Sequence, residues 1–405
     1  MKKRLMKVAY KTPPQENWNN FRDPEQRNPN YITDEHYARL AEAGFTHGLA
    51  LLEHGSDVAL RALAMAEKHG LQYYVRDEIN WANILHKDFY YLNGENYRKY
   101  MQSPAFAGVY VHDEPNASKY PELANMVKGY YEFFGEVGEP LVNLLPTYAN
   151  HIEQLGADNY EAYIRGYLEQ VPISYVMYDH YPFRLQKNGE WLLHTDYLYN
   201  AETAARLCKE YGKELRTFLQ ACEVDEQGGA LMSEMLSFQI HTHLAYGSHA
   251  LVYYYYWGGM CGLRNGVVTE NGTPTHIYEA AKSAHEQIAR YEEPLMDCVW
   301  QKTLYLKGKK HHHNQVEFAR FACENGEEFS SEYDCIVGVF DYKGKTAYYA
   351  VNYVNPIEGL QNKLSFRLNG GFALYGKDGA KCVDGVGECV LGVGEGVFFL
   401  PKEKE

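Results

Sequence analysis

The sequence has no long apolar run and no excess of positive charge. Its longest uninterrupted apolar stretch, residues 250–257, is far shorter than the roughly 20 residues that a membrane-spanning helix needs. With 39 Lys and Arg against 53 Asp and Glu, the formal net charge is -14, which disfavours nucleic acid and membranes as partners. The basic residues 1–7 are not followed by the apolar stretch of a secretory signal. We therefore expect a soluble, cytoplasmic protein.

Several catalytic signatures are also absent. The eight cysteines form no Cys-x-x-Cys pair, so the sequence has no zinc-ribbon or redox motif, and we expect free thiols in a reducing compartment. No Gly-x-Ser-x-Gly nucleophile elbow occurs. The first apolar run is followed by Thr12, Pro13 and Pro14 rather than by a glycine-rich phosphate loop, which disfavours a dinucleotide-binding fold.

A helix-like segment that ends in glycine and precedes an apolar run occurs three times. The segments are residues 33–44, 56–70 and 200–212. The first opens on Thr33 with acidic residues in its first turn, which is typical of a helix N-terminus. Such an alternation of helix and strand indicates βα units around a parallel sheet.

Eight apolar runs in the first part of the chain can form strands. They are residues 7–11, 46–52, 71–76, 107–112, 140–145, 173–178, 215–221 and 250–257. Eight strands separated by helical patterns match a (β/α)₈ TIM barrel, whose usual length is about 250 residues or more. We therefore predict an α/β chain with a barrel over residues 1–295, and an open, doubly wound sheet is the alternative.

The composition changes after residue 296. Short β-rich runs with glycine turns follow at residues 303–306, 318–323, 335–342, 346–353, 363–368 and 397–400. This pattern predicts a small all-β, sandwich-like C-terminal domain over residues 296–405. We expect this domain to pack against the barrel or to support a homo-oligomer. His311, His312 and His313 lie in a basic loop, where consecutive side chains point in different directions and do not favour a metal site.

Acidic, histidine and aromatic residues collect where the predicted strands end. They are Trp18, Asp77, Trp81, His112, Asp113, Glu114, Tyr178, Asp179, His180, Tyr181, Gln220, Glu223 and Trp257. One such cluster would suit an ordinary turn whose acids face water. Several on successive strands indicate a shared site, because the carboxyl ends of barrel strands meet at one mouth, where barrel enzymes bind their substrates.

Two of these carboxylates are placed for glycoside hydrolysis. Glu114 ends the fourth predicted strand and Glu223 follows the seventh, so the two would face each other across the mouth. Glycosidases use such a pair, with one carboxyl as acid/base and the other as nucleophile or base. Aromatic rings around the pair can stack on sugar rings. Two alternatives stay open at the seventh strand, namely Glu226 as the second carboxylate, or Gln220 in its place with no acid.

The two strand ends resemble those of the clan A retaining glycoside hydrolases, in which Glu followed by Pro ends strand four and a second Glu ends strand seven. These enzymes are (β/α)₈ barrels, often with an appended β-sandwich. The resemblance implies that Glu114 is the general acid/base, that Glu223 is the nucleophile, and that the remaining strand-end residues bind a carbohydrate substrate without a cofactor. The clan usually has Asn before the acid/base, where this chain has Asp113.

Two other functions would suit the same barrel. A catalytically degenerate barrel would bind carbohydrate without turning it over. A metal-assisted hydrolase or isomerase would draw on His112, Asp113, Asp179, His180 and His243. We predict no metal site, because neighbouring residues on one strand point to opposite faces, and His241 and His243 stand two residues apart on a predicted helix.

Overall fold

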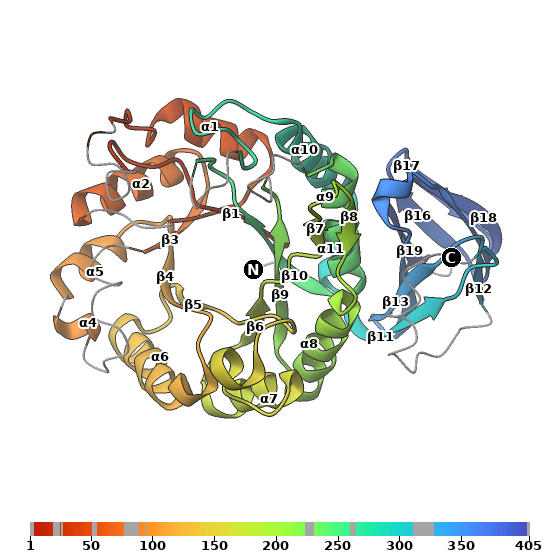
Figure 1. Cartoon of the computed structure of the whole chain (residues 1–405), viewed down its shortest axis with the longest axis horizontal. Helices are drawn as coiled ribbons and strands as arrows, with labels where there is room; N and C mark the ends of the chain where they lie inside the picture. Colours follow the sequence, from red (N-terminus) through yellow and green to blue (C-terminus); the bar gives the residue numbers. More distant parts are fainter. Residues whose placement is uncertain are drawn as a thin grey trace.

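Eight parallel strands form a closed barrel in the computed structural model, which describes residues 4–18, 25, 27–50, 55–76, 89–92, 94–222, 231–259, 265–310 and 328–402 (Figure 1). The strands are β1 (Met6–Tyr10), β2 (His47–Leu49), β3 (Gln72–Val75), β4 (Phe106–Asp113), β5 (Glu139–Asn143), β6 (Tyr175–Tyr178), β9 (Glu214–Gln220) and β10 (Ser248–Tyr254). Their order is β5-β4-β3-β2-β1-β10-β9-β6. The Leu144 amide donates to the Met177 carbonyl at 2.8 Å, which joins β5 to β6 and closes the ring.

The closed ring confirms the predicted barrel and excludes the open sheet. Each of the eight predicted strands overlaps an observed one, with ends that differ by one to three residues at most positions. The agreement has a simple cause. Strands of a parallel barrel are covered by helices on one face and by the packed interior on the other, so they read as continuous apolar runs.

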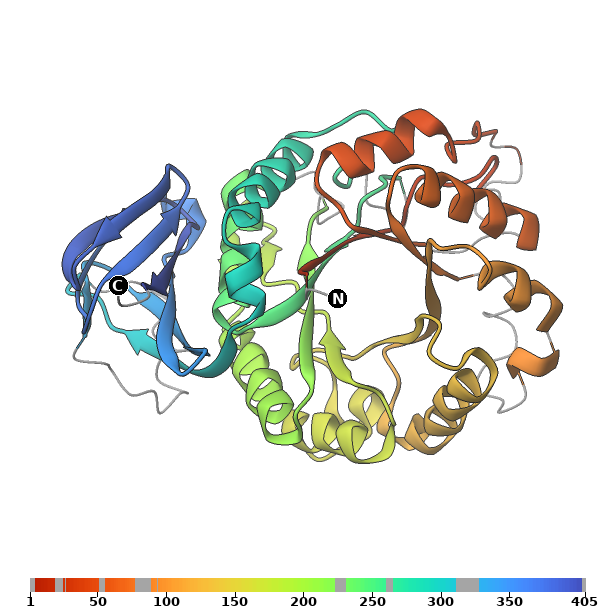
Figure 2. The ribbon, with the colours of Figure 1, turned by 180° about the vertical axis from the view of Figure 1, so that it is seen from behind.

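Helices surround the barrel, as Figures 1 and 2 show from opposite sides. They are α1 (Asp34–Glu42), α2 (Ser56–Lys68), α4 (Phe89–Leu92), α5 (Gly94–Tyr100), α6 (Tyr120–Phe134), α7 (Tyr160–Gln170), α8 (Tyr197–Tyr211), α9 (Ser233–Ala245), α10 (His276–Ala289) and α11 (Glu292–Met296). Short helical turns are Ala117–Lys119, His151–Leu155 and Pro356–Glu358. No helix among the described residues is long and apolar enough to cross a membrane.

Tyrosine side chains form much of the contact between α6 and α7. On α7, Tyr160, Tyr163 and Tyr167 recur at helical spacing and are buried, so this face turns toward the barrel and its neighbours. The Tyr120 ring of α6 packs 5.6 Å from Tyr163 and 5.7 Å from Tyr167. The Asn159 side chain caps α7 by accepting from the Ala162 amide. These tyrosines therefore serve packing.

The C-terminal part is a two-layer antiparallel β-structure. One sheet has the order β11-β13-β14-β19-β16-β17, and the other has the order β12-β15-β18. The strands are β11 (Val299–Leu306), β12 (Phe329–Ser331), β13 (Cys335–Tyr342), β14 (Lys345–Asn352), β15 (Asn362–Arg367), β16 (Phe372–Gly376), β17 (Gly379–Val383), β18 (Val386–Leu391) and β19 (Gly396–Pro401). The predicted all-β domain is therefore present, whereas its predicted strand at residues 318–323 lies outside the described residues.

The larger sheet of the β-domain packs on the barrel through α9. Alternate residues of β14 face opposite ways, so Tyr349 and Val351 join the barrel core while Ala350 joins the core between the two sheets. The His241 ring of α9 lies 2.8 Å from the Tyr349 hydroxyl. The boundary predicted between residues 295 and 296 stays a prediction, and α11 spans that position.

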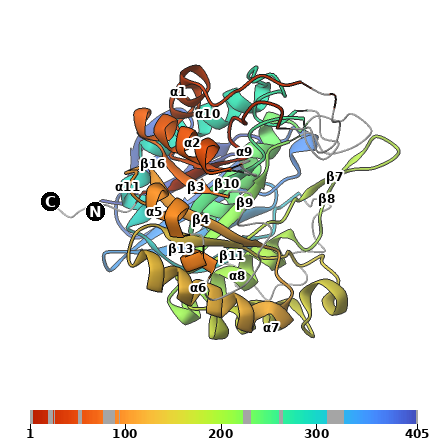
Figure 3. The same ribbon diagram turned by 90° about the vertical axis from the view of Figure 1, so that its left-hand side faces the viewer.

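A hairpin that the sequence analysis did not predict follows β6. It consists of β7 (Phe183–Leu185) and β8 (Trp191–Leu193), which pair as antiparallel strands. Figure 3 shows it projecting on the right, away from the barrel. Its two strands have only three residues each, too few for a pattern of alternation to stand out in the sequence.

Candidate active site

Strand β4 brings Asp113 and Glu114 to the mouth of the barrel. Asp113 is the last residue of β4 and pairs in register with Asn143 at the end of β5. The Glu114 amide donates to the Asn143 carbonyl at 2.8 Å, and Glu114 has a φ of 49°. This left-handed conformation is uncommon for a residue with a side chain, and it ends the alternation of the strand. Two neighbouring acids can therefore both serve the same mouth.

Glu114 is hydrogen-bonded to Asp179, the residue that follows β6. The Asn143 amide nitrogen donates to Asp113 Oδ1 at 3.2 Å and to Asp179 Oδ1 at 3.1 Å. One buried amide thus joins the two aspartates, and Asp179 reaches the glutamate. Three consecutive barrel strands supply these four side chains.

The protonation of Glu114 and Asp179 is shifted by burial and by the neighbouring charges. Although Glu114 keeps solvent access, the surrounding protein and the Asp113 charge raise the pKa of Glu114 to about 7. Burial, together with the charges of Glu114 and Asp113, also raises the pKa of Asp179 well above its usual value. The Glu114–Asp179 pair therefore retains a proton near neutral pH, which is the property a general acid requires.

Aromatic side chains line one side of this acidic cluster. The Tyr254 ring at the end of β10 is stacked on Tyr10 of β1 at 5.7 Å and on Tyr181 at 4.8 Å. The side chain of Tyr181 hydrogen-bonds Asp179, and that of Tyr110 hydrogen-bonds Asp113. Tyrosine rings can stack on the apolar face of a ligand, while their hydroxyls hydrogen-bond to polar groups around its edge.

Two cations border the same mouth. The Arg76 guanidinium at the end of β3 lies 4.5 Å from the centre of the Tyr110 ring and donates to the Tyr10 hydroxyl at 3.3 Å. The Lys11 ammonium lies 4.4 Å from the centre of the Trp18 ring. Trp18, one of the predicted contact residues, is 5 % exposed and packs on this lysine. Both cations contact aromatic rings and help to hold the wall in place.

Four predicted substrate contacts, residues 178–181, lie at the end of β6, and their side chains point alternately to opposite sides. Asp179 and Tyr181 join the acidic cluster. Tyr178 is fully buried, with its ring 6.0 Å from His243 in the helix layer. His180 is also fully buried and contacts Asp196. The side chains of Tyr178 and His180 therefore point away from the acidic cluster, because successive side chains of an extended segment point to opposite sides. Their role as substrate contacts stays a prediction.

Gln220 and Trp257, two further predicted substrate contacts, are also buried and bonded within the protein. Gln220 is fully buried, and its amide accepts from the Phe183 amide at 3.0 Å and donates to the Phe183 carbonyl at 2.8 Å. Trp257 is 1 % exposed, packs 4.6 Å from Tyr31 and donates to the Glu270 carbonyl at 3.1 Å. Both had been predicted from their positions at strand ends, but position alone does not show where a side chain points.

His112 stays at the edge of the site. Its ring is half-buried, and Nδ1 lies 2.8 Å from the Asp113 carbonyl oxygen. Burial lowers the pKa of His112, so the ring is neutral at neutral pH. A role in binding a substrate hydroxyl remains a prediction for this residue.

The residues suggested for a metal at the mouth do not converge. His243 belongs to α9, and its Nε2 lies 2.9 Å from the Tyr197 hydroxyl. His180 points into the same helix layer, whereas Asp113 and Asp179 meet at the mouth. This distribution removes the set of ligands from which the metal-assisted alternative was built.

Four predicted residues cannot be placed. The described residues stop at Arg76 after β3 and at Cys222 after β9. Outside them lie Asp77, Trp81, Glu223 and the alternative Glu226. The roles of these four residues remain predictions, and so does the distance between the carboxyl groups of Glu114 and Glu223.

Asn143 and Tyr148 are among the contributors that the sequence analysis missed. Asn143 could have been found, because it lies within the fifth predicted strand, but the end of that strand was not searched for polar residues. Tyr148 follows the same strand. Burial raises the pKa of its hydroxyl, and the nearby charges of Asp179 and Glu114 raise it further. No local pattern in the sequence distinguishes Tyr148 from the many packing tyrosines.

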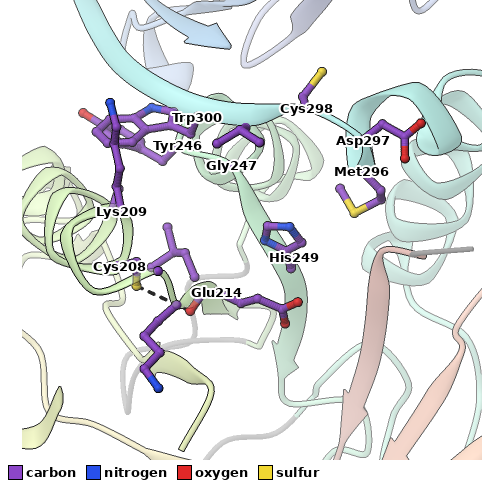
Figure 4. Close-up of a pocket in the computed structure, with 15 residues that line it drawn as sticks. Cys208, Lys209, Glu214, Tyr246, Gly247, His249, Met296, Asp297, Cys298 and Trp300 are labelled. Atoms are coloured by element: carbon purple, nitrogen blue, oxygen red, sulfur yellow. Dashed lines mark hydrogen bonds between the residues drawn. The ribbon is translucent and has the colours of Figure 1, made fainter. Parts of the chain in front are cut away.

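A separate pocket of about 390 Å³ lies at the opposite end of the barrel (Figure 4). It is lined by the end of α8, by the beginnings of β9 and β10, and by the segment that leads into β11. Cys208 Sγ donates to the Glu214 carbonyl at 3.4 Å in its wall. Barrel enzymes work at the carboxyl ends of their strands, so we assign this pocket no part in catalysis.

No family model and no curated protein matches the chain. Among solved structures, it is similar to a glucosidase from Croceicoccus marinus, at 9% identity and a TM-score of 0.47 over 98% of this chain and 95% of that chain. It is similar to an endoglucanase from Pseudomonas stutzeri, at 10% identity and 0.48 over 69% and 92%. A β-galactosidase from Marinomonas ef1 matches at 8% identity and 0.48 over 73% and 62%. These similarities are loose, and the fold rests on the strand order of the chain itself.

Proposed function

We propose that the protein is a glycoside hydrolase in which Glu114 is the general acid/base. The observation that supports this most strongly is the carboxyl pair at the mouth, where Glu114 is hydrogen-bonded to Asp179 and its pKa is raised to about 7. Cleaving a glycosidic bond requires a carboxylic acid that still holds its proton at the working pH. The stacked tyrosines beside the pair provide faces on which sugar rings pack.

Asp179 is a positioning residue in this proposal. Asp179 is buried, whereas Glu114 faces solvent at the mouth, so a bound sugar meets Glu114 and not Asp179. Asp179 acts on the reaction only through Glu114, to which it is hydrogen-bonded.

The second reacting carboxylate is then a residue other than Asp179, and we propose Glu223. In the retaining reaction, Glu114 gives its proton to the glycosidic oxygen while a Glu223 oxygen bonds to the anomeric carbon, and the leaving group departs as an alcohol. Glu114 then takes a proton from water, whose oxygen displaces Glu223 and releases the sugar. Asp113 and Asn143 lie beside Glu114 and can accept from and donate to sugar hydroxyls.

Leaving-group dependence tests the role of Glu114. The variant Glu114→Ala should lose about 10²–10⁴-fold in kcat/KM on methyl glycosides, whose alkoxide needs protonation. It should lose less than about tenfold on dinitrophenyl glycosides of the same sugar, whose leaving group departs without a proton. Equal losses on both substrates would show that Glu114 is not the acid. Binding of a panel of glycosides without turnover would instead favour the degenerate, carbohydrate-binding barrel.

A second experiment tests the nucleophile. Glu223→Gln should abolish turnover even of dinitrophenyl glycosides, whereas Glu226→Gln should retain most of it. The configuration of the first product, followed by proton NMR, should be that of the substrate. A product of inverted configuration would contradict the retaining mechanism while leaving Glu114 as the acid.

A further inference from the structure

Behind the mouth, His180, His194 and Asp196 converge on one point. Among the described residues, these three side chains could hold a metal ion. Each offers one ligand atom, and the three ligand atoms lie within 4.8 Å of one another. His180 follows β6, and the other two lie between the hairpin strand β8 and helix α8. Separate stretches of chain thus bring these three side chains together.

Both imidazoles are directed at the same carboxylate oxygen. His180 Nε2 lies 3.1 Å from Asp196 Oδ1, and His194 Nδ1 also contacts Oδ1. The His180 side chain is fully buried, whereas those of His194 and Asp196 are 22% and 14% exposed. The group therefore has a closed side formed by His180 and a side that water can reach.

The position of Asp196 gives a second, independent observation. Asp196 is the N-cap residue of the 15-residue helix α8, where an aspartate normally accepts hydrogen bonds from the first free amides of the helix. Its side chain makes no such bond here and is turned toward the two imidazoles. A capping hydrogen bond would stabilise the helix by about 1 kcal/mol. The Asp196 side chain contacts His180 and His194 and does not form that bond.

We propose that His180, His194 and Asp196 bind one divalent transition-metal ion of the Zn²⁺ class. Two imidazole nitrogens and one carboxylate oxygen are ligands that zinc accepts, and three protein ligands leave one position for water. The exposed edge of His194 and Asp196 provides the access for that water. The Tyr148 ring covers the group, 4.9 Å from the centre of the His180 ring and 5.0 Å from that of His194.

The metal site adjoins the candidate active site without being part of it. His180 is the residue after Asp179, so an ion held by His180 would fix the segment that carries Asp179. It would also join this segment to the start of α8. The ion is thus a structural clamp for the β6 end, and the proposal does not depend on the reaction at the mouth.

Metal binding to the whole chain tests the proposal directly. Protein stripped with a chelator is titrated with ZnCl₂ in competition with a chromophoric chelator, and the bound metal is counted by mass spectrometry. The adjacent His311, His312 and His313 could bind zinc adventitiously, so the titration uses the H311A/H312A/H313A background. We expect one Zn²⁺ per chain in that background.

Single variants then locate the ion. His194→Ala and Asp196→Asn should each weaken zinc binding by 100-fold or more, because each removes one of three ligands. His151→Ala, which changes an exposed histidine elsewhere, is the matched control and should bind as the background does. Both ligand positions are partly exposed, and a cooperative thermal transition confirms that each variant is folded.

Further outcomes decide the proposal. Co²⁺ bound at the site should give visible absorption bands, which disappear in His194→Ala. Zinc binding that vanishes in the H311A/H312A/H313A background, or that is unchanged in both His194→Ala and Asp196→Asn, would overturn it. The three residues would then be a histidine–aspartate hydrogen-bond cluster only.

Discussion

Glu114 combines an uncommon backbone angle with an uncommon protonation state. Its φ of 49° lets it follow Asp113 into the same mouth, and the charge of that neighbour helps to raise its pKa to about 7. The family that the sequence resembles usually has Asn in place of Asp113. The Asn143 side chain on the adjacent strand donates to Asp113 at 3.2 Å.

The variant Asp113→Asn tests how much of the Glu114 pKa comes from its neighbour. Removing the negative charge lowers the pKa of Glu114, so Glu114 loses its proton at a lower pH. The basic limb of the profile of kcat/KM against pH should move to lower pH by about half a unit to one unit. The profile is measured on an aryl glycoside that the wild type cleaves. An unmoved basic limb would show that burial alone sets the pKa.

Glu114→Gln should make the protein more stable at high pH. Because the folded pKa of about 7 exceeds that of the unfolded chain, folding takes up a proton between about pH 4.5 and 7, and stability falls as pH rises through that window. The uncharged glutamine avoids this loss. Allowing for screening at a solvent-facing carboxyl, we expect a gain of about 1 kcal/mol above pH 7 and none below pH 4.

Urea unfolding at several pH values measures this difference in the free energy of unfolding. Glu67→Gln, on the exposed side of α2, is the control and should show no such trend. A gain of equal size at acid and alkaline pH would mean that the effect of Glu114→Gln comes from packing and not from the proton.

At the scale of elements, the sequence predicted strands better than side-chain directions. Buried parallel strands are apolar throughout, so the eight runs were visible. Side chains alternate along a strand, so only every second strand-end residue faces the mouth. Asp179 and Tyr181 face it, whereas Tyr178 and His180 do not. A list of strand ends does not show which residues of each strand have that orientation. The partners of His180, on the unpredicted loop after β8, could not be predicted at all.

Glycine 108 shows how closely neighbouring strands approach. Gly108 lies in β4 with a φ of 140°, and a Cβ there would stand 1.8 Å from the Glu139 carbonyl oxygen. Gly108→Ala should therefore destabilise the protein by about 4 kcal/mol or more, since both the backbone and the β4–β5 contact must shift. Thermal or urea unfolding gives the value.

Gly166→Ala provides the contrast. Gly166 lies within α7, and a Cβ there would meet its nearest neighbour at an ordinary 3.6 Å. Because alanine favours a helix over glycine, this variant should be unchanged or up to about 1 kcal/mol more stable. A mild effect of Gly108→Ala, similar to that of Gly166→Ala, would contradict the close β4–β5 approach.

The whole molecule is held together by a shared core. Residues of the larger β-sheet, such as Tyr349 and Phe398, belong to the same hydrophobic cluster as the barrel. The hydroxyls of Tyr291 and Tyr349 lie 2.8 Å apart, and the Tyr349 hydroxyl also meets His241 of α9. Since these contacts cross between barrel and β-domain, we expect the two parts to unfold in one transition.

Buried histidines should make this transition sensitive to acid. His47, His241, His243 and His285 are held uncharged, because burial lowers their pKa values to about 4, 4, 3 and 3. In the unfolded chain each takes up a proton near pH 6.5. The unfolded state therefore binds more protons than the folded state between about pH 4 and 6.5, and stability falls as pH decreases through that range.

Three carboxyls act in the opposite direction, and the balance can be predicted. The pKa values of Glu114 and Glu202 are raised to about 7, and that of Asp179 is raised well above its usual value, so each favours the folded state as pH decreases. Four histidines outweigh three carboxyls, and the net free energy of unfolding should decrease from pH 6.5 to pH 4. His241→Gln keeps a polar group beside Tyr349 but cannot titrate. The slope of the free energy of unfolding against pH should therefore decrease by up to about 1.4 kcal/mol per pH unit, which corresponds to one proton. Urea titrations at intervals across this range give the slope, and an unchanged slope in His241→Gln would show that His241 is charged in the folded protein.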